Sequence, residues 1–214
     1  MKDYILNWNQ KRILKQVEFL KKYGFYLAGG TAIALQFGHR TSKDLDFYTK
    51  KHFKNTDVTR EFREVFGKEV TDIRRAADTL FLKIRQTDLS FFQYSYKLIR
   101  PLIHYLTVNL ASAEDITAMK IEAIIERGRK RDFVDIYYSI QNFGLENVLK
   151  FVQEKYPETF NEWNCLNALL YFKDAELPQK DRKRIYLYHN IEWKNIREYI
   201  TEEVKKYQLG LIKK

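Results

Sequence analysis

Cysteine, proline and long apolar runs are all scarce in this chain of 214 residues. The single cysteine, Cys165, excludes an internal disulfide framework and a zinc site built from several cysteines. With three prolines and eight glycines, the chain has no low-complexity linker. No apolar run approaches the roughly 20 residues of a membrane helix, and the N-terminus MKDYILNWNQKRIL carries charges where a signal peptide is apolar. We therefore expect a globular cytoplasmic protein without a membrane partner.

Positive charge is in excess, with 38 Lys and Arg against 28 Asp and Glu, a formal net charge of +10. Residues 1–110 contain 20 basic and 11 acidic residues, whereas residues 111–214 contain 18 and 17. A basic first half favours a polyanionic partner such as RNA. A merely solvated, lysine-rich surface would have the same composition.

Apolar periodicity predicts an α/β first half, joined near residue 110 to a helical second half. The elements expected in the first half are a helix over residues 9–22, a strand over 25–28, a helix over 31–37, a strand over 45–48, a helix beginning near 55, a hairpin over 80–92 and a strand over 104–110. In the second half, a helix beginning near Ser112 is interrupted at Gly128, and a final amphipathic helix covers residues 193–207. We therefore expect two domains, 1–110 and 111–214.

The most informative stretch is LAGGTAIALQFGHRTSKDLDFY, from Leu27 to Tyr48. A short strand ends in Gly29 and Gly30, and a helix follows directly. Glycine permits a sharp turn and a close approach of a ligand. The N-terminus of the helix offers unpaired N–H groups and partial positive charge, which suit a triphosphate. The Thr31 hydroxyl could cap this helix or donate to a phosphate oxygen.

Asp44 and Asp46 open the next apolar run. Because side chains alternate along a strand, the two carboxylates are expected on one face, with Leu45 in the core. Adjacent carboxylates repel each other unless a cation lies between them, and Mg²⁺ prefers such oxygen ligands. A solvated turn could also carry this pattern, but the preceding Gly-Gly turn favours metal-assisted nucleotidyl transfer. Arg40, just before the pair, is interpreted as a phosphate contact or part of a helix stop.

A third metal-binding carboxylate is expected on a neighbouring strand. Asp88 is the best-placed acid, since it lies in the second strand of the predicted hairpin with Ser90 on the same face. Alternatively, Asp88 is a turn residue that closes the hairpin.

A second constellation lies in DITAMKIEAIIERGRKRDFVDIYYSI. Lys120 sits among apolar residues, and Arg127 follows seven residues later, so both side chains can share one helix face. Asp132 and Asp135, one helical turn apart, could orient Lys120 or Arg131, or act as a base. An enclosed cation could hold a triphosphate and neutralise charge on the leaving group. A surface ion-pair network is the alternative.

Together these two stretches resemble the AbiEii/AbiGii abortive-infection toxin family, within the DNA polymerase β-like nucleotidyltransferase superfamily. The likeness covers roughly residues 20–145. It implies an α+β fold with a mixed β-sheet nucleotidyltransferase core and flanking helices, followed by a helical C-terminal bundle. It also implies an NTP substrate with Mg²⁺, an acceptor such as tRNA, and an antitoxin encoded nearby. At the position of Thr31, serine is common in the superfamily. Threonine differs from serine but has the same hydroxyl group.

The resemblance assigns roles to individual residues: Gly30 and Thr31 hold the triphosphate, Asp44 and Asp46 bind the metal, Lys120 contacts the nucleotide, and Asp132 is the remaining catalytic acid. The residue patterns themselves add Gly29, Arg40 and Arg131 as nucleotide contacts and Asp88 as a third metal ligand, with Asp132 in its place or two acids alone as the alternatives. The expected catalytic residues are thus Asp44, Asp46, Lys120 and Asp132. Two other functions share these features. One is nucleotidyl transfer to a small molecule or protein, and the other is a non-catalytic module that binds a nucleotide or RNA.

Overall fold

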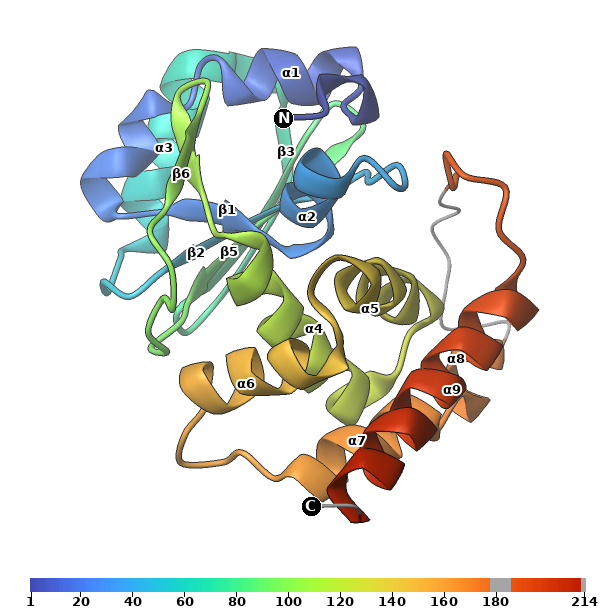
Figure 1. Ribbon diagram of the computed structural model, residues 1–214. Helices are drawn as coiled ribbons and strands as arrows, with labels where there is room; N and C mark the ends of the chain where they lie inside the picture. The colour runs from blue at the N-terminus through green and yellow to red at the C-terminus, as the bar shows by residue number, and fades with distance from the viewer. Residues whose placement is uncertain (178–185, 213–214) are drawn as a thin grey trace. The chain divides into compact units, whose positions relative to one another are not determined.

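The computed structural model describes residues 1–177 and 186–212, and the chain divides into two compact units, Met1–Ser112 and Ala113–Lys214 (Figure 1). Residues 180–184 carry four basic side chains, and we interpret them from the sequence as a solvated loop or an RNA contact; they lie outside the described residues. No helix among those that the structure describes is long and apolar enough to cross a membrane.

The N-terminal unit is built on one mixed sheet of seven strands in the order β3-β4-β5-β2-β1-β7-β6. The strands are β1 (Tyr26–Ala28), β2 (Leu45–Thr49), β3 (Val70–Ala76), β4 (Thr79–Ile84), β5 (Thr87–Gln93), β6 (Ile103–Tyr105) and β7 (Val108–Leu110). The pairs β2–β5 and β1–β7 are parallel, and the other neighbouring pairs are antiparallel. The mixed sheet and the α+β class are therefore as expected.

One face of this sheet forms the core of the unit. Strand alternation places Phe47 and Phe91 on this face, with their rings stacked 5.2 Å apart between centroids. Phe62 of α3 packs edge-on against Phe91 at 5.4 Å, so α3 covers the core face. The opposite face carries Asp46, and its side chains on β2, β4 and β5 are half-buried.

The helices of the N-terminal unit are α1 (Trp8–Leu14), α2 (Gly29–Phe37) and α3 (Asn55–Phe66), with short 3₁₀ helices at Asp3–Ile5, Glu18–Tyr23 and Gly67–Glu69. The single helix predicted over 9–22 is wrong, because α1 ends at Leu14 and a 3₁₀ helix begins at Glu18. Ile13, Val17 and Leu20 are all buried as expected. Val17 and Leu20 are three residues apart, a spacing that suits both helix types, so periodicity did not distinguish a 3₁₀ helix there.

The single strand predicted over 104–110 is also wrong. It is a hairpin in which β6 and β7 pair, with His104 opposite Asn109. Leu106 in the turn has a φ of +52°. The sequence did not indicate this turn, because it has no glycine or asparagine there. The Thr107 hydroxyl donates a 2.7 Å hydrogen bond to the carbonyl of Leu14, so a tertiary contact supports this turn.

In the part of the C-terminal unit that the structure describes, the secondary-structure elements are helices. Its helices are α4 (Ala113–Arg127), α5 (Lys130–Phe143), α6 (Leu145–Lys155), α7 (Glu162–Leu170), α8 (Lys173–Glu176) and α9 (Trp193–Ile212). The interruption predicted at Gly128 is confirmed, since α4 ends at Arg127 and α5 begins at Lys130. Helix α4 packs on α5, α6 and α7, which makes it the central helix of this unit.

Candidate functional site

The aspartate pair lies where β2 begins. Asp46 is half-buried between Leu45 and Phe47, whose side chains are fully buried, so the predicted alternation is confirmed for these three residues. Asp46 lies opposite Ala28 of β1 and beside Ser90 of β5. Asp44 precedes the regular strand, so strand alternation does not set the direction of its side chain.

Two glycines separate opposite charges at the start of α2. Gly29 has a φ of +63°, and a Cβ there would lie 2.7 Å from Asp46 Oδ2. A Cβ on Gly30 would lie 2.6 Å from Nη2 of Arg40. Neither position therefore has room for a side chain, and this is the close approach for which glycine is needed. The Asp46 carboxylate and the Arg40 guanidinium thus flank the first turn of α2.

Arg40 and Thr31 are both buried, at 1% exposure each. Arg40 Nη1 donates to the carbonyl of Thr41 at 2.9 Å, which holds the guanidinium near Gly30. The Thr31 hydroxyl donates to the main-chain carbonyl of Asp44, and helix α2 has no side-chain N-cap. Thr31 therefore does not cap helix α2. Its hydroxyl instead connects the helix to the start of the aspartate pair.

Asp88 lies on β5 on the same face as Asp46, because Ser90 is the residue in register with Asp46. Its carboxylate is 46% exposed and lies 3.9 Å from Nζ of Lys83 on β4. Within residues 1–177 and 186–212, no group of three or more His, Cys, Asp or Glu side chains is arranged to hold a metal ion. Asp44 and Asp46 are therefore not joined by Asp88 in a three-carboxylate cluster, and the role of Asp88 as a ligand stays a prediction.

In the C-terminal unit, Lys120 of α4 bridges two acids of α5. Its Nζ lies 2.7 Å from Asp132 Oδ1 and 2.8 Å from Asp135 Oδ2. Both aspartates are fully buried, and the Lys120 side chain is 8% exposed. The prediction that these acids orient Lys120 is confirmed, and the network is buried rather than a surface one. Arg131, in the first turn of α5, is half-buried.

The two carboxylate oxygens of Asp132 differ in their hydrogen bonds, since only Oδ1 accepts one from Lys120. Asp132 Oδ2 is buried and accepts no hydrogen bond. The Nε atom of Arg127 lies 3.7 Å from this oxygen, which is beyond hydrogen-bond length. Lys120 and Arg127 thus face the same carboxylate, as their spacing predicted. A buried carboxylate oxygen without a donor is costly unless a ligand or proton completes it.

Sequence reasoning missed a second buried ion pair in the same unit. Lys155, at the end of α6, lies 2.7 Å from Asp115 in the first turn of α4, and both side chains are fully buried. The two residues are 40 positions apart, so no local sequence spacing indicates that they form a pair. One sequence feature could have indicated this pair. Asp115 lies in the buried first turn of α4, and a buried carboxylate needs a cation from another part of the chain.

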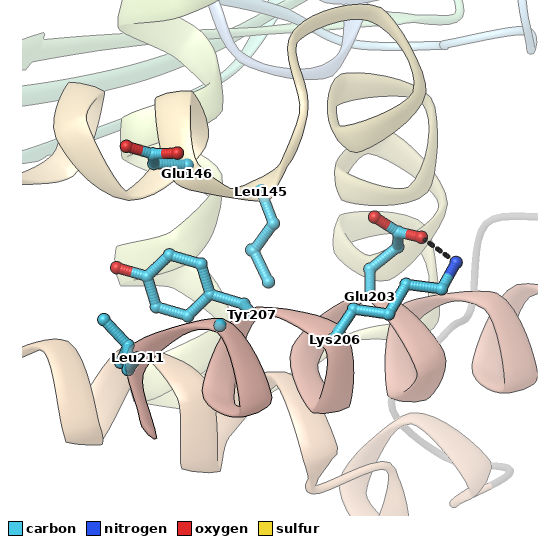
Figure 2. A pocket seen from close by; sticks show the side chains of 7 residues that line it. Leu145, Glu146, Glu203, Lys206, Tyr207 and Leu211 are labelled. Atoms are coloured by element: carbon cyan, nitrogen blue, oxygen red, sulfur yellow. Dashed lines mark hydrogen bonds and ion pairs between the residues drawn. The ribbon is translucent and has the colours of Figure 1, made fainter. Parts of the chain in front are cut away.

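The helical unit also has an open hollow of about 320 Å³ (Figure 2). It lies between α6 and α9, and its lining is Leu145, Glu146, Glu203, Lys206, Tyr207, Gly210 and Leu211. Figure 2 shows the ion pair of Glu203 with Lys206, 2.7 Å long, at one end. None of the predicted site residues lines this hollow, so the candidate chemistry is not located there.

Comparisons with known proteins show the family to which the chain belongs. The family model "Nucleotidyl transferase AbiEii toxin, Type IV TA system" matches residues 12–206. An uncharacterized protein of Aquifex aeolicus, aq_aa25, is 33% identical over 191 residues, which are 86% of this chain and 87% of that protein.

Two solved structures share the fold. A candidate nucleotidyltransferase from H. pylori is 14% identical, with a TM-score of 0.64, over 97% of this chain and 98% of that one. MenT4, a nucleotidyltransferase toxin from Mycobacterium tuberculosis, is 13% identical, with a TM-score of 0.59, over 92% of this chain and 80% of that one.

Proposed function

The chain belongs to the AbiEii family of nucleotidyl transferase toxins, and we propose that it transfers a nucleotide from an NTP to the 3′ hydroxyl of an RNA, with tRNA as the acceptor. The observation that carries this proposal is the position of the Asp46 carboxylate against Gly29, at the N-terminus of α2. In the reaction, a bond forms between the RNA 3′ oxygen and the α-phosphorus. The bond from the α-phosphorus to pyrophosphate breaks, and the hydroxyl proton leaves to a base.

Asp44 and Asp46 fit a magnesium site of the kind that is completed by substrate. Mg²⁺ is commonly bound by one or two carboxylates together with phosphate oxygens, so two acids are enough. When bound, the ion would lower the charge at the reacting phosphate and favour attack by the hydroxyl. Thr31 supports this site, because its hydroxyl fixes the main chain at Asp44. Asp88 is the proposed third ligand.

The first turn of α2 is the proposed triphosphate site. The N–H groups of a helix's first turn have no partner within the helix, and the positive end of the helix favours an anion. Arg40 adds a fixed positive charge beside Gly30. Because Arg40 is buried and tied to the Thr41 carbonyl, it is already oriented before a nucleotide binds.

For the helical unit we carry over the roles that the family resemblance suggests. Lys120 would contact the nucleotide, and Asp132 would be the remaining catalytic acid. From the residue pattern we add Arg131 as a further nucleotide contact. The support within this chain is Asp132 Oδ2, which is buried without a hydrogen bond, whereas Oδ1 is occupied by Lys120. We further propose that the two units are a nucleotidyltransferase domain and a helical domain, that an antitoxin encoded nearby controls the protein, and that it acts in the cytoplasm.

The test is incubation of the purified protein with each labelled NTP, Mg²⁺ and total tRNA. Wild type is expected to label tRNA with one NTP or a few, and Asp46→Asn and omission of Mg²⁺ are each expected to abolish the labelling. Asp57→Asn is the matched control, since Asp57 is a half-buried acid of α3 that pairs with Arg60 at 3.5 Å and is not among the proposed site residues. Equal labelling by wild type and Asp46→Asn would overturn the proposal.

Two other outcomes correspond to different functions. If small molecules or proteins are labelled in an Asp46-dependent way and tRNA is not, the chemistry stands and the acceptor is wrong. If Asp44→Ala and Asp46→Asn remain toxic in cells, toxicity comes from binding rather than from transfer.

A further inference from the structure

The face of the sheet that carries Asp46 continues across three more strands. In register, Asp46 of β2 is followed by Ser90 of β5, Phe81 of β4 and Arg74 of β3. Adjacent strands are about 4.8 Å apart, so Phe81 lies about 10 Å across the sheet from Asp46. One cross-strand row thus leads from the proposed metal ligand to the edge of the sheet.

Aromatic side chains form a continuous row beside it. Tyr48, which lies two positions after Asp46 on β2, has its ring 5.2 Å from that of Phe92 on β5. Phe92 in turn contacts Phe81 of β4 edge-on at 5.8 Å. All three rings are half-buried, although the opposite face of the same strands is fully buried. We refer to Tyr48, Phe92 and Phe81 as the aromatic row.

A cation lies at the outer end of the aromatic row. The guanidinium of Arg74 is 5.4 Å from the centre of the Phe81 ring, and Arg74 is exposed. Arg75, the next residue on β3, is exposed as well. Strand β3 is the outermost strand, so this charge borders solvent. Partly exposed rings beside arginines are the combination that holds single-stranded nucleic acid, with bases on the rings and phosphates on the cations.

We propose that the aromatic row and Arg74 bind the single-stranded 3′ end of the acceptor RNA. This inference rests on the proposed function, because it takes the acceptor to be RNA whose terminal hydroxyl must reach the Asp46 end of the row. The bases stack on the rings of Tyr48, Phe92 and Phe81, and Arg74 contacts a phosphate. The basic excess of residues 1–110, with 20 basic against 11 acidic residues, complements such a strand.

The experiment measures binding of a 5′-fluorescein-labelled, eight-nucleotide single-stranded RNA by anisotropy, in EDTA and without NTP. Phe81→Leu and Phe92→Leu keep the apolar volume but remove the ring, and each is expected to weaken binding about 5- to 150-fold. The variants Phe81→Tyr and Phe92→Tyr are expected to restore it. Arg74→Gln is expected to reduce the slope of log Kd against log salt by about 0.7.

Matched controls exist elsewhere in the same unit. Trp8 is an exposed ring 5.4 Å from the guanidinium of Arg12, the same distance as in the Phe81 and Arg74 pair. Trp8→Leu is expected to leave RNA binding unchanged, as is Arg60→Gln on α3. Thermal melting of every variant checks that the fold is retained.

Equal RNA binding by wild type and the Phe81→Leu, Phe92→Leu double variant would overturn the inference. So would an equal loss for a blunt RNA duplex, because a duplex cannot stack its bases on the rings. The proposed function fails separately. If tRNA is not labelled but RNA binding requires Phe81, the RNA site stands without the transfer reaction. If tRNA labelling requires Asp46 but RNA binding is unchanged in Phe81→Leu, the proposed reaction is retained and this RNA site is wrong.

Discussion

The side-chain hydroxyl of Thr31, in the first turn of α2, donates a hydrogen bond to the main-chain carbonyl of Asp44. This bond joins the proposed phosphate-binding turn to the start of the aspartate pair, across 13 residues of sequence. Thr31 is 1% exposed, so water does not replace the donor if it is removed. One buried hydroxyl therefore helps to hold the proposed phosphate-binding turn and the proposed metal ligands together.

Replacing Thr31 should separate the effect of the hydroxyl from that of its volume. Thr31→Val leaves the Asp44 carbonyl without its donor, at a cost of about 1–3 kcal/mol in the free energy of unfolding. We expect transfer to fall and the Mg²⁺ concentration for half-maximal activity to rise. Thr31→Ser should keep both near wild type. Steady-state assays with varied Mg²⁺ measure this, and a Thr31→Ser variant as impaired as Thr31→Val would contradict it.

Gly29→Ala should remove activity for a steric reason. Alanine at a positive φ costs about 1–2 kcal/mol, and here its Cβ would also press on Asp46 Oδ2. The control is Gly67→Ala, where φ is +55° and nothing lies within 4 Å of an added Cβ. Both variants should melt at lower temperature than wild type, but only Gly29→Ala should lose transfer. Similar activity in the two folded variants would show that Asp46 tolerates the displacement.

The two buried Lys–Asp pairs of the helical unit permit a direct comparison. Both have an N–O distance of 2.7 Å, yet only Asp132 has an oxygen without a hydrogen bond. Lys120→Met and Lys155→Met should each destabilise the protein by about 3–5 kcal/mol, because each leaves a buried carboxylate without its cation. Denaturant unfolding measures this loss.

Activity should separate the same two pairs. Asp132→Asn should lower the turnover number by about 100- to 1000-fold in molecules that remain folded. Asp115→Asn should reduce stability but leave the turnover number of the folded fraction near that of wild type. If both substitutions reduce stability and neither reduces turnover, the Lys120 cluster is purely structural.

The protein should lose stability in acid partly through Glu69. Side-chain hydrogen bonds from Arg12 and Arg85 lower the pKa of Glu69 to about 2, from an ordinary value of 4.5. Because the unfolded chain binds this proton more readily, the stabilisation is complete above about pH 4.5 and is lost as the pH falls towards 2. Glu69→Gln lacks the charge in both states.

Melting temperatures recorded between pH 6 and pH 2 provide the measurement. Wild type should be more stable than Glu69→Gln at pH 6, and the difference should shrink as the pH falls. A difference that is constant over this range would exclude the ionised Glu69 as its source.

Cys165 should react slowly with thiol reagents. It is 1% exposed on α7, and burial raises the pKa of its thiol to about 11. At pH 8 little thiolate is present and the reagent has no access, so labelling requires opening of the helical unit. Labelling of the native protein should therefore accelerate with guanidinium in parallel with unfolding. Rapid labelling in buffer alone would contradict the burial of α7.

How much of the site could be predicted depended on whether neighbours in sequence are neighbours in space. The glycine pair between β1 and the body of α2 and the burial of Leu45 beside Asp46 are local patterns, and both were predicted, although α2 already begins at Gly29. The helix over 9–22 failed because the same apolar spacing suits an α-helix and a 3₁₀ helix. Lys155 was missed because its partner Asp115 lies 40 positions away, and a lone lysine carries no sign of burial.

By itself, the sequence determined which segments carry the chemistry: glycines where the chain must turn closely, carboxylates at a strand start, and a lysine in an apolar helix. Only the tertiary structure decided what lies beside them. Parallel pairing of β2 with β5 sets Asp46 next to Ser90 and extends that face to Phe81. Strand order depends on burying a whole sheet face at once, and such non-local packing leaves no short-range signal in the chain.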